Sequence, residues 1–263
     1  MSAPLKTPPV FFTLCQVRFN KLLTLADYLP KIQEAFRKAG YPAYSVNYMV
    51  VFQMIAGQSG NPENQPVPVT QETYHFGNLK KTHSFVLDAQ KLTLQSTMYG
   101  CFEDFSSEFM KGMTILNDIL DLSFFERIGL RYLDRVIPKY NDSIAQYLVD
   151  QVQGVLPVLK GEGIFTYAES MIQKDGVKLC ARVLTQNGEL AFPPDIQPVD
   201  MAIEPRFVAY RGISAVLDND GFIEQREEFY LPAIETHLVK IHEVISQAFK
   251  ATVTQYALEV WNT

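Results

Sequence analysis

Apolar and polar positions along the first half of the chain predict strands on either side of a helix, followed by a second helix. Residues 10–19 (VFFTLCQVRF) are rich in β-branched and aromatic residues and predict a strand. Residues 25–39 carry apolar side chains at helical spacing and end at Gly40, which predicts a helix. We place four more strands at residues 46–55, 74–79, 84–88 and 92–99.

Two further features complete the first half. Residues 57–70 are rich in Gly, Asn, Pro and Gln and predict a loop. The apolar side chains from Phe102 to Leu120 recur three, four or seven residues apart, which predicts the second helix. The order predicted for this half is therefore β-α-β-β-β-β-α.

The second half repeats this order of signals. We predict a strand at 124–137, a helix from 141 or 143 to about 159, and strands at 164–173, 177–185, 206–217 and 222–229. Asp218-Asn219-Asp220-Gly221 is typical of a hairpin turn between the last two strands. A final helix is expected from residue 231 to about 254.

The closing helices of the two halves match at one constant offset. Phe102 aligns with Leu231 and Leu120 with Phe249, in each case 129 residues apart, as do three apolar positions between them. We therefore predict an α+β fold of two β-α-β4-α pseudo-repeats, residues 1–121 and 122–263. Their strands would join into one antiparallel sheet with the helices on one face, a TATA-binding-protein-like topology.

Composition and charge narrow the range of partners. The chain has 263 residues, 47% of them hydrophobic, and a formal net charge of −6. This charge repels nucleic acid phosphates and acidic membranes, so we expect neither as a partner. The three cysteines are widely spaced among apolar residues and the N-terminus lacks a secretory pattern, so we expect a cytoplasmic protein.

The spacing rules of common catalytic and metal sites are not met. His237 and His242 are five residues apart, whereas a zinc protease helix needs two histidines four apart. Gly161-Glu162-Gly163 has no following Gly-Lys-Ser/Thr and predicts a turn rather than a phosphate loop. We therefore assign no catalytic residue, no metal ligand and no cofactor.

Arginines on one predicted strand form the best candidate site. Alternation along residues 125–135 places Arg127, Arg131 and Arg135 on one face, with Gly129 leaving room between the first two. Arg18 occupies the matching place in the first repeat and is expected to join them. Guanidinium groups in this arrangement can bind carboxylate or phosphate, although they could equally pair with the protein's own carboxylates.

The segment Arg127-Ile128-Gly129-Leu130-Arg131-Tyr132, with weaker patterns near both ends of the chain, resembles a sporadically distributed prokaryotic family of proteins of about 250 residues. The resemblance implies an accessory role in bacteria, in mobile-element or defence gene clusters. It supplies no catalytic residue.

Three functions remain open at this point. The leading hypothesis is a non-enzymatic binding or regulatory protein that holds a protein partner or an anionic ligand on its arginine face, with a homodimer also considered. The second is a small-molecule sensor or an enzyme with a pocket between the sheet and the long helices. The third, opposed by the net charge, is a nucleic acid saddle that uses Phe11-Phe12 and Phe124-Phe125 as wedges.

Overall fold

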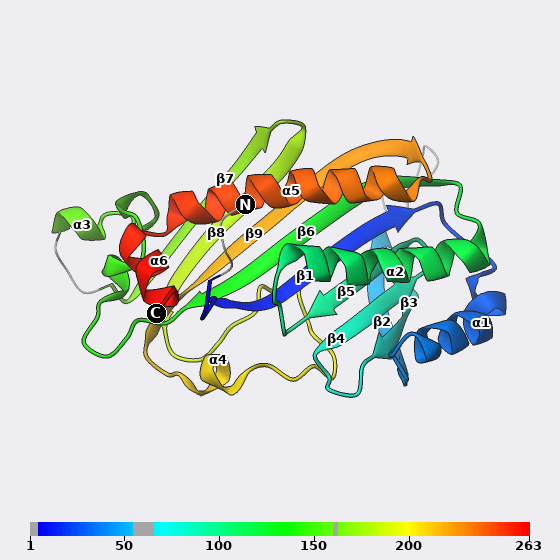
Figure 1. The fold of residues 1–263 in the computed structure, drawn as a ribbon, viewed down its shortest axis with the longest axis horizontal. Coiled ribbons are helices and arrows are strands. Elements are labelled where there is room, and N and C mark those ends of the chain that lie inside the picture. Colours follow the sequence, from blue (N-terminus) through cyan, green and yellow to red (C-terminus); the bar gives the residue numbers. More distant parts are fainter. Residues whose placement is uncertain (1–4, 55–65, 160–162) are drawn as a thin grey trace.

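The computed structural model describes residues 5–54, 66–159 and 163–263. Within them a single nine-stranded antiparallel sheet runs in the order β2-β3-β4-β5-β1-β6-β9-β8-β7 (Figure 1). The first strands of the two predicted halves, β1 and β6, lie side by side near the middle of the sheet. The protein is therefore α+β, with strands from both halves in one sheet.

The strands and helices have these bounds. The strands are β1 (Val10–Phe19), β2 (Ala43–Met54), β3 (Pro66–Gly77), β4 (His83–Asp88), β5 (Lys91–Ser96), β6 (Phe124–Val136), β7 (Phe165–Lys174), β8 (Val177–Asn187) and β9 (Ile213–Glu228). The α-helices are α1 (Leu25–Lys38), α2 (Phe102–Leu120), α3 (Leu156–Leu159), α4 (Pro205–Ala209), α5 (Leu231–Thr252) and α6 (Gln255–Trp261). Two short 3-10 helices, η1 (Ile144–Gln146) and η2 (Asp150–Val152), precede α3.

The first half has the predicted order of elements, β1-α1-β2-β3-β4-β5-α2. Of the loop expected at 57–70, residues 57–65 lie outside the described residues, and residues 66–70 belong to β3. Helices α2 and α5 begin at Phe102 and Leu231, the two residues that the 129-residue offset aligns. Helical periodicity thus placed the two long helices correctly.

The helix predicted from 141 or 143 to about 159 is wrong. This segment forms η1, η2 and the four-residue α3 instead. Ser143 caps η1 through its side chain, and Gly154 has a φ of +63°, a left-handed conformation that interrupts a right-handed helix. Local capping and a glycine break therefore override the apolar periodicity here.

The hairpin predicted at Asp218–Gly221 is also wrong. Strand β9 runs without a break from Ile213 to Glu228, so β6 is followed by three strands rather than four. Of the strand predicted at 206–217, the first residues belong to α4, and the rest from Ile213 onward belong to β9. A TATA-binding-protein-like relationship between the halves stays a prediction.

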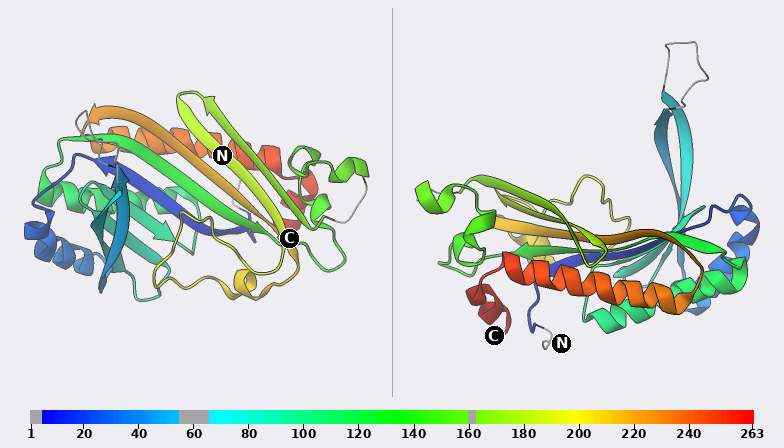
Figure 2. Two further views of the ribbon diagram at one scale, coloured as in Figure 1. Left: turned by 180° about the vertical axis from the view of Figure 1, so that it is seen from behind. Right: turned by 90° about the horizontal axis from the view of Figure 1, so that it is seen from above.

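The long helices lie on one face of the sheet. Figure 2 shows α1, α2 and α5 on the same side of the strands. Their apolar side chains, among them Phe36, Phe109 and Leu238, share the main hydrophobic core with sheet residues such as Leu94 and Leu130. At roughly 25 cal/mol per Å² of apolar surface, this burial is the main stabilising contribution to the fold. We call the sheet side opposite these helices the far face.

Part of the far face is covered by the connection between β8 and β9, residues 188–212. Ile196 and Phe207 from this connection pack on Phe12, Leu133 and Val216 of the sheet in a separate core. The sheet face on which the sequence analysis places the arginines is therefore not an entirely open surface, because this connection packs on part of it. Among the helices of the described residues, none is long and apolar enough to cross a membrane.

Candidate functional site

Strand β6 alternates between the two faces of the sheet as the sequence predicts. Ile128 and Leu130 are buried in the core beneath the long helices. Arg127 contacts Phe222 and Arg131 contacts Asp218, both on the far face. The predicted grouping of the arginines on one face is therefore confirmed, and what differs among them is their contacts.

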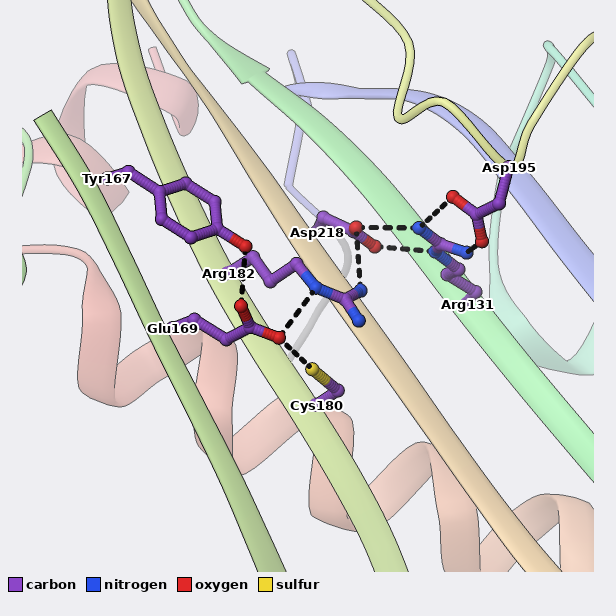
Figure 3. Close-up of polar contacts among 7 residues, drawn as sticks. All are labelled: Arg131, Tyr167, Glu169, Cys180, Arg182, Asp195 and Asp218. Carbon is purple, nitrogen blue, oxygen red and sulfur yellow. Dashed lines mark hydrogen bonds and ion pairs between the residues drawn. The ribbon is translucent and has the colours of Figure 1, made fainter. Parts of the chain in front are cut away.

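Arg131 lies between two carboxylates (Figure 3). It donates to both oxygens of Asp218, from Nε at 2.6 Å and from Nη2 at 2.7 Å. It also donates to both oxygens of Asp195, at 2.6 Å and 3.2 Å. Burial alone would lower the pKa of Arg131, but these hydrogen bonds raise it above its ordinary value. The guanidinium group of Arg131 is thus engaged within the protein.

These contacts extend across four strands of the sheet (Figure 3). Arg182 on β8 donates to Asp218 at 3.0 Å and to Glu169 on β7 at 3.2 Å. Tyr167 donates to the other oxygen of Glu169 at 2.7 Å. Each of the three carboxylates in this network, Asp195, Asp218 and Glu169, has an arginine partner. The network therefore links β6, β9, β8 and β7 and leaves none of these three carboxylates unpaired.

Cys180 contributes its thiol to the same network. Its Sγ lies 3.2 Å from Glu169 Oε1, in hydrogen-bonding geometry. Burial is the larger cause and the hydrogen bond to Glu169 the smaller one, and together they raise the pKa of Cys180 to about 11. The thiol therefore stays protonated near neutral pH, which makes it a poor nucleophile.

Arg135 is buried and holds the 188–212 connection against the sheet. Its guanidinium group donates to the backbone carbonyls of Phe207 and Gly188 and to the hydroxyl of Ser214, the last two at 3.0 Å. Only 1% of its surface is exposed. Arg135 and Arg131 are therefore structural residues in this fold, and neither is free to bind a ligand.

Arg127 differs from Arg131 and Arg135. Its guanidinium carbon lies 4.4 Å from the centroid of the Phe222 ring, and the described residues provide it with no hydrogen bond or ion pair. A Cβ at Gly129 would come within 2.9 Å of its Nη1, so the glycine makes room for this guanidinium, as predicted. Burial lowers the pKa of Arg127, against the opposing effect of Asp220 and Glu224.

Arg18 on β1 lies directly opposite Arg127 in the strand register. It forms a 3.5 Å ion pair with Glu126, and its side chain is 40% exposed. Its Nε has no hydrogen-bond partner among the described residues. Like charges directly opposite in a sheet are destabilising unless an anion lies between them. Arg18 and Arg127 are therefore the two predicted arginines that could bind an external anion.

Distance separates this pair from Arg131. Arg127 and Arg131 are four residues apart in one strand, which places their Cα atoms about 13 Å apart. The guanidinium group of Arg131 is in addition already hydrogen-bonded to Asp195 and Asp218, so it offers little to an anion bound at Arg127. The predicted four-arginine site divides into a structural pair, Arg131 and Arg135, and an available pair, Arg18 and Arg127.

A buried polar cluster on the helix side of the sheet was missed by the sequence reasoning. Tyr99 and Tyr132 share a hydroxyl contact at 3.1 Å, and the Tyr132 hydroxyl lies 3.2 Å from Nδ1 of His242. Asp134 lies two residues further along β6, 6% exposed, and burial raises its pKa to about 7. Strand alternation could have identified it, since Asp134 shares the inward parity of Leu130 and Tyr132.

The second hypothesis required a concave pocket between the sheet and the helices. A cavity of about 390 Å³ lies beside the start of α2. Tyr41 and Glu108 both line it, and the Tyr41 hydroxyl donates to Glu108 at 2.8 Å. His83 also lines it, and burial lowers the pKa of His83. Its volume falls within the range of small-molecule sites.

The wedge required by the nucleic acid hypothesis is not available. Phe11, Phe12 and Phe125 are each 1% exposed, and Phe124 lies under the guanidinium of Arg226. The three buried rings cannot insert between bases without disrupting the core, and Phe124 would have to leave its contact with Arg226. Across the described ranges, no group of three or more His, Cys, Asp or Glu side chains is arranged to hold a metal ion.

Comparison with known proteins adds no relative to this picture. No family model, no curated protein and no solved structure matches the chain. The functional argument therefore rests on the geometry of the molecule itself.

Proposed function

We propose that this protein is a non-enzymatic binding protein that holds carboxylate or phosphate groups of a partner against Arg127 and Arg18. The observation that carries the proposal is the direct opposition of these two arginines on the far face, where Arg127 forms no hydrogen bond or ion pair with any described residue and has Asp220 and Glu224 only as more distant charges. An incoming anion would neutralise two like charges at once.

The surroundings of Arg127 support an anion and orient it. The Phe222 ring fixes the guanidinium plane, and Lys178 places its ammonium 5.8 Å from the centroid of the same ring. A planar guanidinium on a rigid strand loses little conformational freedom when it forms a bidentate contact. The arrangement suits a carboxylate or phosphate that approaches from solvent.

Nearby carboxylates favour a partner that presents more than one anionic group. Glu224, opposite Arg127 in the register, forms a 2.9 Å ion pair with Lys178. Asp220 carries a raised pKa because of burial, partly opposed by Arg131 and Arg127. A single weak anion would compete poorly with these acidic neighbours, whereas an acidic segment can engage Arg18 and Arg127 together.

The test is recovery of a partner from native cells by tagged protein, followed by mass spectrometry. Wild type and an Arg37→Ala control, which alters an exposed arginine on α1, should recover the same partner in stoichiometric amount. Arg127→Glu should lose it. Equal recovery by the Arg127→Glu variant, or no stoichiometric partner with wild type, would contradict the proposal.

The cavity beside α2 favours a second candidate function, the binding of a small polar molecule. Gly100 lines this cavity, and a Cβ there would meet nothing within 4 Å, so a Gly100→Phe substitution can fill the space without a backbone clash. A fragment screen observed by NMR should give ligands for wild type that the filled variant loses. Ligands that bind both proteins equally would place their site elsewhere.

A further inference from the structure

Strand β7 leaves an unusual amount of apolar surface at one edge of the sheet. Among the described residues, nineteen large hydrophobic side chains are exposed, and eight of them lie between residues 155 and 172. Phe165 and Met171 on β7 are 62% and 64% exposed. Four of the eight, Phe165, Tyr167, Met171 and Ile172, lie on β7 itself, which is a sheet edge because it pairs only with β8.

The edge lacks the features that usually prevent sheet extension. Strand β7 is ten residues long, contains no proline, and pairs with β8 in an unbroken register from Phe165 to Lys174. Its one acidic side chain, Glu169, is engaged by Arg182 and Tyr167, and its one lysine, Lys174, is at the end of the strand and donates to Gln247. Exposed edge strands of this kind pair readily with another strand, and soluble proteins normally block or cover them.

The sequence of β7 is complementary to itself. Two identical antiparallel edges related by a twofold axis place residues opposite one another whose numbers have an even, constant sum. With the axis at Ala168, Phe165 faces the partner's Met171 on the far face. On the helix face Thr166 faces the partner's Ser170 and the small Ala168 faces its own copy, while Ile172 lies opposite the partner's Ile164, the residue just before the strand.

Other registers are less favourable. An axis at Glu169 would place two carboxylates directly opposite one another, which destabilises a strand pair. An axis at Ser170 would set Met171 against the partner's Glu169 and Tyr167 against the partner's Gln173. The Ala168 register alone aligns large apolar side chains with one another at both ends.

We infer that β7 is a homodimer interface, in which two copies of the chain join their sheets through antiparallel pairing centred on Ala168. The twofold symmetry limits the assembly to a dimer at this edge, because each β7 is then paired on both sides and cannot bind a third copy. Each copy gains backbone hydrogen bonds along its outer edge and brings the exposed apolar side chains of β7 against those of its partner.

Multi-angle light scattering after size-exclusion chromatography tests this inference. Wild type should have a mass of about 60 kDa at 100 µM, twice the 29.9 kDa of the chain. Phe165→Lys should raise the dimer dissociation constant at least tenfold, with an unchanged circular dichroism spectrum. Tyr140→Lys, at a 94% exposed position away from this strand, should remain dimeric.

The register itself is tested by charge rescue. Met171→Glu alone should weaken the dimer, whereas Phe165→Lys combined with Met171→Glu places opposite charges across the interface twice. The double variant should return to within tenfold of the wild-type dissociation constant. Ala168→Cys should form a covalent dimer under mild oxidation that wild type, treated in parallel, does not form.

Three results would overturn the inference. They are a monomeric wild type at 100 µM, a dimer unaffected by Phe165→Lys, and a double variant no tighter than either single variant. An inability of Ala168→Cys to cross-link a confirmed dimer would exclude the register centred on that residue.

Discussion

Arg127 and Arg131 differ by four positions in one strand, yet their surroundings assign them opposite roles. Arg131 is hydrogen-bonded to Asp195 and Asp218, whereas Arg127 stacks on Phe222 and forms no ion pair with a carboxylate among the described residues. A guanidinium already hydrogen-bonded to two carboxylates gains little from a third anion. The availability of an arginine on this sheet is thus decided by its contacts rather than by its place in the alternation.

The first prediction concerns Arg131. Arg131→Ala leaves Asp218 buried beside Arg182 alone, and removing one partner of a buried ion pair typically costs about 3–5 kcal/mol. We expect that loss in the free energy of unfolding, measured by urea denaturation. Asp195→Ala should cost less, because the Asp195 side chain is 65% exposed. Arg131→Ala with wild-type stability would refute the structural assignment.

The second prediction concerns Asp134. Its pKa of about 7 in the folded protein exceeds the ordinary value of 3.8, so the folded state retains a proton that the unfolded chain releases. The contribution of Asp134 to stability is therefore greatest below about pH 4 and declines as the pH rises toward 7. Asp134→Asn should match wild type at pH 4 and exceed it by about 2–4 kcal/mol at pH 8.

Urea denaturation of both proteins across this range provides the measurement. The difference between the two curves should open between pH 4 and pH 7 and stay constant above. A wild-type protein that gains stability relative to Asp134→Asn as the pH rises would reverse the sign and contradict the burial of a neutral carboxyl group.

Close packing between elements explains two glycines that local propensity would not favour. A Cβ on Gly112 of α2 would lie 2.3 Å from the Phe85 ring on β4, and one on Gly221 of β9 would lie 2.9 Å from Ile241 on α5. The missing side chains let both helices approach the sheet closely. These contacts set the distance between the helix layer and the strands.

The third prediction follows from Gly112. Alanine is the better helix former by about 0.5–1 kcal/mol, yet Gly112→Ala should destabilise the protein by about 1–3 kcal/mol because the buried Phe85 ring must move. Thermal melts should show the loss. Gly100→Ala is the matched control, because a Cβ there meets nothing within 4 Å, and its melting temperature should equal that of wild type. A stabilised Gly112→Ala would refute the close approach.

Element boundaries were predictable where one local signal dominated. Apolar periodicity fixed the starts of α2 and α5, and β-branched and aromatic residues fixed β1 at Val10–Phe19. Prediction failed at Asp218–Gly221 because the local turn signal is outweighed by the ion pairs of Asp218 with Arg131 and Arg182. Those partners lie on other strands and leave no local trace.

At the scale of the whole molecule, the sequence predicts the single antiparallel sheet and its long helices. It does not predict that the 188–212 connection covers part of the far face. Asp195 and Asp218 lie 64 and 87 residues from Arg131 in the chain. Alternation predicts the face on which a side chain lies, but only the path of the 188–212 connection determines which arginines it covers. Among the described residues, no hydrogen bond or ion pair joins Arg127 or Arg18 to this connection; Arg18 pairs with Glu126, and Arg127 lies against Phe222.

The most direct test of the account is the affinity of the far face for a defined acidic probe. A labelled octaglutamate peptide, titrated by fluorescence anisotropy at low salt, should bind wild type and the Arg37→Ala control equally. Arg127→Ala should weaken binding at least tenfold and change the urea denaturation midpoint far less than Arg131→Ala does, since Arg127 forms no hydrogen bond or ion pair within the described residues. Unchanged affinity in Arg127→Ala would contradict the assignment of this arginine as the site of anion binding.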